Sequence, residues 1–397
     1  MIRSFVLLTL ILFGLSLFAQ TTVTVRIDPD NARGGTATEV FDSIRFIPLE
    51  TTKESLFGTI NQMEVTDSLF IILDINSNSI LLFRRNGKFY TKIFTGGGTK
   101  YFYSFTLDRS ANEIIARNNY TDGLLVYDLQ GKFLRKEVNP SEVMTLFHLP
   151  GNTVLYAFYR KRKVESPDHM VFDLGYSKGY NQVFKNILPG DARNDDVQTA
   201  TPGTTFNFSG EEGSCMFTRP YEYNIYQLND TGLLRKYQLI FPLRYSLPLN
   251  FFTDVGYSQK RIKYAFSSPG TASTVLSLDR CYCYGGYLLF SAFTRQLYDG
   301  ADYTFAYNLH SGSLLSFSRV TGDSGSYYFP ILSSLFEKID AIYKDTIFSS
   351  MPGFRLFAFK NGLDKQVNYP EGLKEYFANG KKGDNCVIMQ FRLKPNL

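Results

Sequence analysis

The feature that most constrains this chain is a hairpin pattern that recurs along almost its whole length. Each copy has a short apolar strand, a polar turn containing Gly, Asn or Asp, and a second strand. The six copies are Ile80 to Ile93, Leu124 to Val138, Met170 to Leu188, Tyr223 to Phe241, Phe305 to Val320 and Arg355 to Val367. Their spacing is close to the ~40–50 residues that a four-stranded propeller blade requires, except for one gap that carries the insertion Pro242 to Ser273. The repeat therefore predicts a propeller of six blades.

Further apolar segments precede these hairpins and supply the other strands of each blade. In the first two blades they are Ile60 to Val65, Ser68 to Asp74, Tyr103 to Asp108 and Glu113 to Asn118. We predict an all-β fold of six four-stranded antiparallel blades. Because a ring is usually closed by pairing strands from the two ends of the chain, we expect Phe41 to Glu50 to lie beside Cys386 to Lys394. Short helices are predicted at Leu373 to Asn379 and Leu332 to Ile342 only.

The first twenty residues have the pattern of a secretory signal peptide. Arg3 is positively charged, Phe5 to Phe18 is an uncharged apolar run, and Ala19 is a small residue suited to the cleavage position. The run is shorter than the ~20 residues that span a bilayer, which disfavours a retained anchor. We expect a signal peptide at residues 1–19, a lead-in segment at 20–39 and the propeller at 40–397. The mature chain is predicted to be exported to the periplasm or outside the cell, without a transmembrane span and without the cysteine of a lipoprotein.

Charge and cysteine content exclude several classes of partner. The 42 Lys and Arg residues are nearly balanced by 37 Asp and Glu residues, so no nucleic acid is expected to bind. The four cysteines are Cys215, Cys281, Cys283 and Cys386. We interpret them as small buried hydrophobic residues rather than disulfides or metal ligands, since the three histidines are scattered along the chain. A monomer without metal or other cofactor is predicted.

Several segments resemble the exported six-bladed propeller family of Bacteroides-type bacteria. They are FIPLETT from Phe46 to Thr52, LDINSNSILLFRRNGKF from Leu73 to Phe89, NIYQLNDTG from Asn224 to Gly232 and DNCVIMQFRLK from Asp384 to Lys394. The resemblance covers roughly residue 40 to the C-terminus. It implies the six-bladed fold and export but no activity, because the function of that family is generally unassigned. The chain departs from the family's Gly-x-Gly-Pro-x-Glu-Tyr linker, where Lys100 replaces the Glu, and has Cys386 where Pro is usual.

Two groups of side chains are candidates for a binding site at one mouth of the ring. Tyr101, Tyr103, Tyr327 and Tyr328 lie at the predicted starts of blades, where aromatic rings can stack on sugars. The alternative interpretation of these rings is packing between blades. Arg160 and Lys161 belong to the densest basic cluster, which is either a solvated loop or a site for an anionic glycan or peptide.

The sequence shows no recognisable catalytic constellation. The acidic pair Glu211 and Glu212 is adjacent along the chain, unlike the carboxylates that a glycosidase holds across its substrate, and the glycines after Thr95 lack P-loop spacing. We therefore predict a non-catalytic binding or scaffold propeller that recognises a protein or carbohydrate partner at one mouth. The alternative is a propeller enzyme, a hydrolase or lyase, acting on a carbohydrate or lactone. An acidic cluster converging on the central channel would favour the enzyme.

Overall fold

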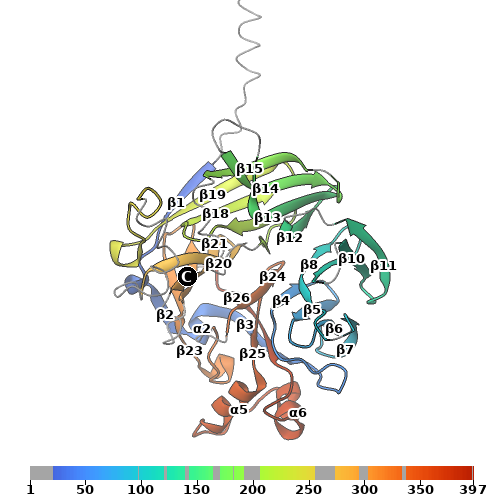
Figure 1. The fold of residues 1–397 in the computed structure, drawn as a ribbon. Helices are drawn as coiled ribbons and strands as arrows, with labels where there is room; N and C mark the ends of the chain where they lie inside the picture. Colours follow the sequence, from blue (N-terminus) through green and yellow to red (C-terminus); the bar gives the residue numbers. More distant parts are fainter. Residues whose placement is uncertain are drawn as a thin grey trace, which may run out of the picture.

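Six small β-sheets stand around a central axis (Figure 1). The structure is a computed structural model that describes residues 21–96, 98–119, 123–138, 143–163, 170–181, 183–191, 206–254, 273–294, 303–332, 337–395 and 397. Side chains at 159–163, 170, 171, 190, 191 and 303 are outside this description, and so is the predicted signal peptide. The predicted all-β six-bladed propeller is confirmed.

Blades 1 to 3 each contain four antiparallel strands in chain order from the axis outwards. Blade 1 consists of β4 (Gln62–Val65), β5 (Leu69–Asp74), β6 (Ser79–Arg84) and β7 (Phe89–Phe94). Blade 2 consists of β8 (Phe102–Asp108), β9 (Glu113–Asn118), β10 (Gly123–Asp128) and β11 (Phe133–Val138). Blade 3 consists of β12 (Val143–Leu149), β13 (Thr153–Lys163), β14 (Met170–Lys178) and β15 (Val183–Asp191). The first three predicted hairpins form the outer two strands of these blades.

Blades 4 and 5 repeat the same pattern, and blade 6 borrows its outer strand from the N-terminal part of the chain. Blade 4 consists of β16 (Phe206–Phe208), β17 (Ser214–Thr218), β18 (Asn224–Asn229) and β19 (Gly232–Ile240). Blade 5 consists of β20 (Val275–Tyr284), β21 (Tyr287–Thr294), β22 (Tyr303–Asn308) and β23 (Leu314–Thr321). Blade 6 consists of β24 (Ile339–Tyr343), β25 (Thr346–Met351), β26 (Val387–Leu393) and β3 (Phe41–Pro48).

The ring closes where β26 pairs with β3, as the sequence predicted. The two strands are antiparallel, with Val387 opposite Pro48 and Phe391 opposite Ile44. Side chains alternate between two hydrophobic clusters. Met389 and Phe391 pack toward blade 5, and Ile388 packs toward blade 1. The closing strand therefore joins the cores on both sides of blade 6.

The segment before β3 is built into the sheets of blades 4 and 5. β1 (Thr21–Arg26) pairs in parallel with β19 of blade 4, and β2 (Arg33–Thr36) pairs in parallel with β23 of blade 5. The short helix α2 (Ala37–Val40) then leads into β3. Val25 and Ile27 are buried between blades 4 and 5. We call residues 21–40 the N-terminal belt, because they run along the outer edges of two blades before entering the third (Figure 1).

Two predicted elements are wrong. The sixth hairpin, Arg355 to Val367, contains no strand, because Gly353–Asn361 forms helix α5 within a long connection between β25 and β26. The predicted helix from Leu332 to Ile342 is also wrong in its described part, where Ile339 begins strand β24. The helix predicted at Leu373 is confirmed as α6 (Glu371–Asn379). Among the described residues, no helix is long and apolar enough to cross a membrane.

All four cysteines are free thiols, as predicted. Cys281 and Cys283 lie on the same side of β20 and pack in the hydrophobic cluster between blades 4 and 5. Burial raises the pKa of Cys283 to about 11, so its thiol stays protonated and unreactive at neutral pH.

Candidate functional site in the central channel

The channel is lined by the six innermost strands, which all run in the same direction along the axis. We call the end where these strands begin, near Asn61 and Tyr103, the start mouth. The end where they finish in hairpin turns, near Asp67, Asp108 and Lys344, is the turn mouth. One cavity of about 320 Å³ reaches inwards from the start mouth and is lined by residues from all the innermost strands. Two cavities of about 210 and 390 Å³ lie at the turn mouth.

β-Bulges interrupt four of the innermost strands, and three of them supply side chains to the start-mouth cavity. The pairing register shifts at Tyr103 in β8, at Arg280 in β20 and at Asp340 in β24, where each inner strand has one residue more than its partner strand. The other bulges are at Met144 in β12 and at Leu276 in β20. A bulge turns the extra side chain away from the regular alternation and is common beside functional sites. Tyr103, Arg280 and Asp340 all line the cavity.

Asp340 is the most deeply buried acid of this cavity. Its side chain is 1% exposed, and its Oδ2 accepts a hydrogen bond of 2.6 Å from the Ser350 hydroxyl. Its Oδ1 has no hydrogen-bond partner, since the Nζ atom of Lys338 is 3.8 Å away. Burial raises the pKa of Asp340 and lowers that of Lys338. Asp340 therefore lines the cavity with a carboxylate of which one oxygen has no hydrogen bond.

Two further side chains complete the polar wall. The amide nitrogen of Asn207 on β16 is buried without a hydrogen-bond partner in the described structure. Arg280 has a positive φ of 50°, which is unfavourable for a non-glycine residue. Its guanidinium donates to the carbonyl of Ile339 at 3.1 Å and lies 3.6 Å from the Asp279 carboxylate. The strained backbone thus places a cation and its counter-charge on the channel wall between blades 5 and 6.

Arg109 separates the start-mouth cavity from the turn mouth. Its Nη2 is 2.6 Å from Oε2 of Glu64, and its Nη1 donates to the carbonyl of Val65 at 2.9 Å. The guanidinium lies 4.7 Å from the ring centre of Phe208 and 5.4 Å from that of Tyr343. Burial raises the pKa of Glu64, and Arg109 partly opposes this effect. Residues from blades 1, 2, 4 and 6 therefore meet across the channel at one guanidinium.

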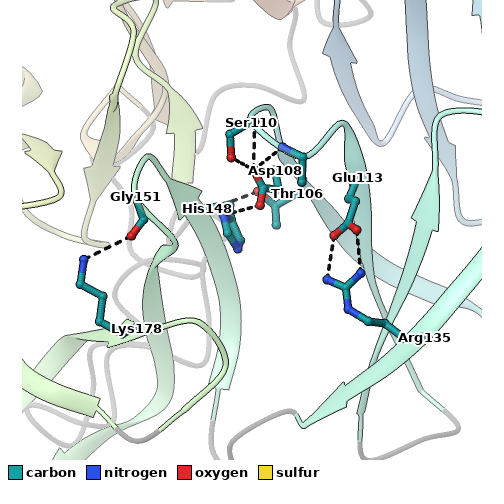
Figure 2. A network of polar contacts seen from close by, with 9 residues as sticks. Thr106, Asp108, Ser110, Glu113, Arg135, His148, Gly151 and Lys178 are labelled. Atoms are coloured by element: carbon teal, nitrogen blue, oxygen red, sulfur yellow. Dashed lines mark hydrogen bonds and ion pairs between the residues drawn. The ribbon is translucent and has the colours of Figure 1, made fainter.

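The turn mouth contains a buried histidine–aspartate pair between blades 2 and 3 (Figure 2). Nδ1 of His148 is 3.5 Å from Oδ2 of Asp108, and the other Asp108 oxygen accepts from the backbone and hydroxyl of Ser110 and from the backbone of Ala111. Burial lowers the pKa of His148, and Asp108 partly opposes this. Burial also disfavours the Asp108 carboxylate, but these hydrogen bonds outweigh it and hold the Asp108 pKa below its ordinary value. The pair is a neutral imidazole held by a fixed carboxylate.

The structure separates the residues that the sequence singled out. Tyr103 lines the start-mouth cavity, and Tyr101 lies against it, with 3.3 Å between the two hydroxyls and 4.9 Å between the ring centres. Tyr327 packs on Tyr369, which precedes helix α6 in the chain. The Nζ of Lys365 lies 3.4 Å from the ring centre of Tyr328. The side chains of Arg160 and Lys161 are outside the described residues.

Sequence reasoning missed Asp340, Arg280 and Asn207. Nothing in the order of residues distinguishes them from other polar positions on strands, because their role depends on strands from blades 4, 5 and 6 meeting at the axis. In the described part of the chain, no group of three or more His, Cys, Asp or Glu side chains is placed to hold a metal ion.

The ring and its channel define the protein as a six-bladed β-propeller with a polar central cavity. The chain belongs to the family described as Domain of unknown function (DUF4934), whose sequence model matches residues 22–392. Among solved structures, a Bacteroides fragilis protein described as exported is similar, with 14% identity and a TM-score of 0.68, covering 94% of this chain and 100% of that one. At that identity the likeness shows the fold alone.

Two further solved structures are similar to a lesser degree. A protein of unknown function from Bacteroides caccae has 10% identity and a TM-score of 0.37, covering 65% of this chain and 81% of that one. A streptogramin B lyase has 11% identity and a TM-score of 0.40, covering 90% and 99%. These two are too dissimilar to inform on function. No curated protein matches the chain.

Proposed function

We propose that the protein is an exported, non-catalytic binding propeller that holds the end of a carbohydrate in the start-mouth cavity. One observation carries this proposal. Bulges place Tyr103, Arg280 and Asp340 in the wall of a single cavity, where a buried acceptor on Asp340 and a buried donor on Asn207 lack hydrogen bonds. Buried polar groups without partners are rare in native proteins, because each costs about 1–3 kcal/mol. A bound ligand would satisfy both.

The chemistry of the wall favours a neutral ligand rich in hydroxyl groups. A sugar hydroxyl donates one hydrogen bond and accepts others, so one ring can serve Asp340 and Asn207 together. The aromatic rings of Tyr103 and Tyr282 also line the cavity and can cover the C–H faces of a sugar. The acids of the lining have cationic neighbours, with Glu64 paired to Arg109 and Asp279 close to Arg280. This balance disfavours a strongly charged ligand.

Export rests on two supports. The first twenty residues have the charge, apolar run and small residue of a signal peptide. A protein with the same fold over nearly its whole length is described as exported. A cavity of about 320 Å³ suits one terminal sugar unit of a glycan presented outside the cell.

Calorimetric titration of the mature chain against a panel of neutral oligosaccharides tests the proposal. We expect at least one of them to bind, and Asp340→Asn to weaken that binding about 10-fold or more, because hydrogen bonds to charged groups contribute ~1.5–3 kcal/mol. The control is Asp345→Asn, which removes an exposed carboxylate from the turn that follows the same strand. Thermal unfolding of both variants shows whether the fold is intact. Equal affinity of a folded Asp340→Asn variant, or no binding across the panel, contradicts the proposal.

A propeller enzyme acting on the same carbohydrate is the second candidate. The observation that favours it is a pair of carboxyl groups in the channel, Glu64 and Asp340. Burial raises the pKa of both, and a carboxyl group with a raised pKa can act as a general acid. Mass spectrometry of the oligosaccharide after incubation separates the two hypotheses. Binding without any change in ligand mass supports the binding protein, and product formation that Asp340→Asn abolishes supports the enzyme.

A further inference from the structure

The outer edge of blade 6 carries an open groove at the position that a fifth strand occupies in the two preceding blades, 4 and 5. Blades 4 and 5 each have five strands, because β1 and β2 of the N-terminal belt add in parallel to the fourth strands β19 and β23. The fourth strand of blade 6 is β3, and it ends its sheet. No backbone hydrogen bond joins the outer edge of β3 to another described segment between Asp42 and Ile47.

The groove lies directly off this edge. It has a volume of about 780 Å³ and is lined by four consecutive residues, Ile44 to Ile47. Successive side chains on a strand point to opposite faces of the sheet, so a hollow that touches all four reaches the edge of the strand. The lining also includes Gln390 of β26, the partner of Arg45, so the hollow extends over one face of the sheet as well. The unpaired N–H and C=O groups of β3 are therefore exposed to a space that one further strand can fill.

The two walls of the groove differ in chemistry. On the side facing blade 5, Phe46 and Tyr327 provide an apolar wall, with 5.8 Å between their ring centres. On the side facing blade 1, Arg45 is exposed and Arg85 lies close by. The Nε of Arg85 is buried without a hydrogen-bond partner in the described structure, while its Nη1 donates to the carbonyl of Thr66.

The charge on this second wall is positive. Asp67, the acid that also lines the groove, is already paired with Lys344 at 2.5 Å. A strand added to β3 would therefore meet apolar surface with one set of alternate side chains and two arginines with the other set. The segment that fits is extended, with apolar and acidic residues in alternation.

We propose that blade 6 binds an extended segment of a partner protein as its fifth strand, along the free edge of β3. The partner segment would add to the outer strand of blade 6, as β1 and β2 of the N-terminal belt add to the outer strands of blades 4 and 5. Backbone hydrogen bonds to β3 supply affinity, and the alternation of apolar and acidic residues supplies specificity. The proposed site lies on the outside of the ring and does not depend on a ligand in the channel.

Three labelled octapeptides test this proposal with the mature chain: alternating Val and Glu, alternating Val and Ser, and alternating Val and Lys. Fluorescence anisotropy gives their affinities, and amide hydrogen exchange reports the binding edge. We expect the Glu peptide to bind most tightly and the Lys peptide least. We also expect it to slow exchange at the amides of residues 42–47.

A matched pair of charge reversals completes the test. Arg45→Glu changes an exposed side chain of the groove, and Lys136→Glu changes an exposed side chain on β11, the outer strand of blade 2. We expect Arg45→Glu to weaken binding of the Glu peptide at least about fivefold, since an exposed ion pair is worth up to ~1 kcal/mol. Lys136→Glu should leave it unchanged. Thermal unfolding confirms that both variants are folded.

The proposal is overturned if none of the peptides binds, if the two variants bind equally, or if protection appears elsewhere than β3. It is also overturned if light scattering shows a concentration-dependent dimer that Arg45→Glu dissociates. In that case the occupant of the edge is a second copy of this chain rather than a partner protein.

Discussion

The side chain of Asn385 fastens the chain where the ring closes, and its removal should destabilise the whole propeller. The residue is 1% exposed and lies two positions before the closing strand β26, which begins at Val387. Its side-chain amide forms three hydrogen bonds, all with backbone groups of the linker between blades 6 and 1. The amide nitrogen donates to the carbonyls of Glu50 and Ser55 at 2.8 and 2.9 Å, and the amide oxygen accepts from the Phe57 N–H at 3.1 Å.

Asn385→Ala leaves the Ser55 carbonyl and the Phe57 N–H without their partner, whereas the Glu50 carbonyl keeps the hydrogen bond from the Ser55 hydroxyl at 2.7 Å. Each unsatisfied buried group costs about 1–3 kcal/mol, so we expect the free energy of unfolding to fall by about 2–6 kcal/mol for the two groups. A domain is typically stable by only ~5–15 kcal/mol, so the loss is a large fraction of the total. Asn385→Asp should be at least as damaging, because it places a carboxylate oxygen against two carbonyl oxygens.

Urea unfolding followed by far-ultraviolet circular dichroism measures the effect, since the chain has no Trp for fluorescence. The control is Asn86→Ala, which removes an exposed amide that accepts one turn hydrogen bond from Lys88. We expect this control to cost about 1 kcal/mol or less. If Asn385→Ala costs no more than the control, water or local movement satisfies the two backbone groups, and the reasoning about closure is refuted.

Three further outcomes are expected. Mass spectrometry of the protein from its native host should find the mature N-terminus at or within a residue or two of Gln20, whereas an intact Met1 would indicate a retained anchor. Thiol titration of the denatured, unreduced protein should detect all four cysteines, and a count of two or fewer would contradict their assignment as free thiols. Burial lowers the pKa of folded His148 below its unfolded value near 6.5, so the unfolded state binds more protons and stability should fall as pH drops from about 6.5 toward the folded pKa. His148→Asn should lose less stability than the native chain between pH 7.5 and 5.5, and an equal loss would assign the effect to other groups.

The sequence was sufficient for the ring because each blade repeats a local pattern. Five of the six predicted hairpins are adjacent strands in the structure, and each depends on turn residues and alternation that lie within about 20 positions. The closing pair was predictable for a different reason. The alternation from Val387 to Leu393 has one continuous apolar face, and only the opposite end of the chain remained to cover its edge.

The sixth hairpin failed because a short apolar run does not distinguish helix from strand. The run from Leu356 to Phe359 is continuously apolar, as in a buried strand, and Asn361 and Gly362 are residues typical of a hairpin turn. In the structure the same residues form α5, where Leu356 and Phe357 lie on the buried side of a helix. The true strand partners, β25 and β26, are separated by the two helices α5 and α6 and show no local hairpin signal.

The channel site was beyond sequence reasoning for a geometric reason. A bulge is decided by how two strands pair, and the sequences around Tyr103, Arg280 and Asp340 share no pattern that marks an extra residue. The aromatic positions were easier to locate than to interpret. Tyr103 faces the cavity, but Tyr327 belongs to an aromatic cluster with Phe46 and Tyr369 outside the ring.

The pairing of the N-terminal belt implies an order of assembly. Thr21 pairs with Arg235, Arg33 pairs with Leu315, and the start of β3 pairs with the end of β26. Each successive part of this N-terminal segment therefore pairs with a strand that lies later in the chain. Such contacts between distant residues form late, because loop-closure entropy must be overcome before they contribute. Until blades 4, 5 and 6 exist, the belt and β3 are unpaired strands. β3 is the last of this series, and no belt strand pairs with its outer edge in the described structure.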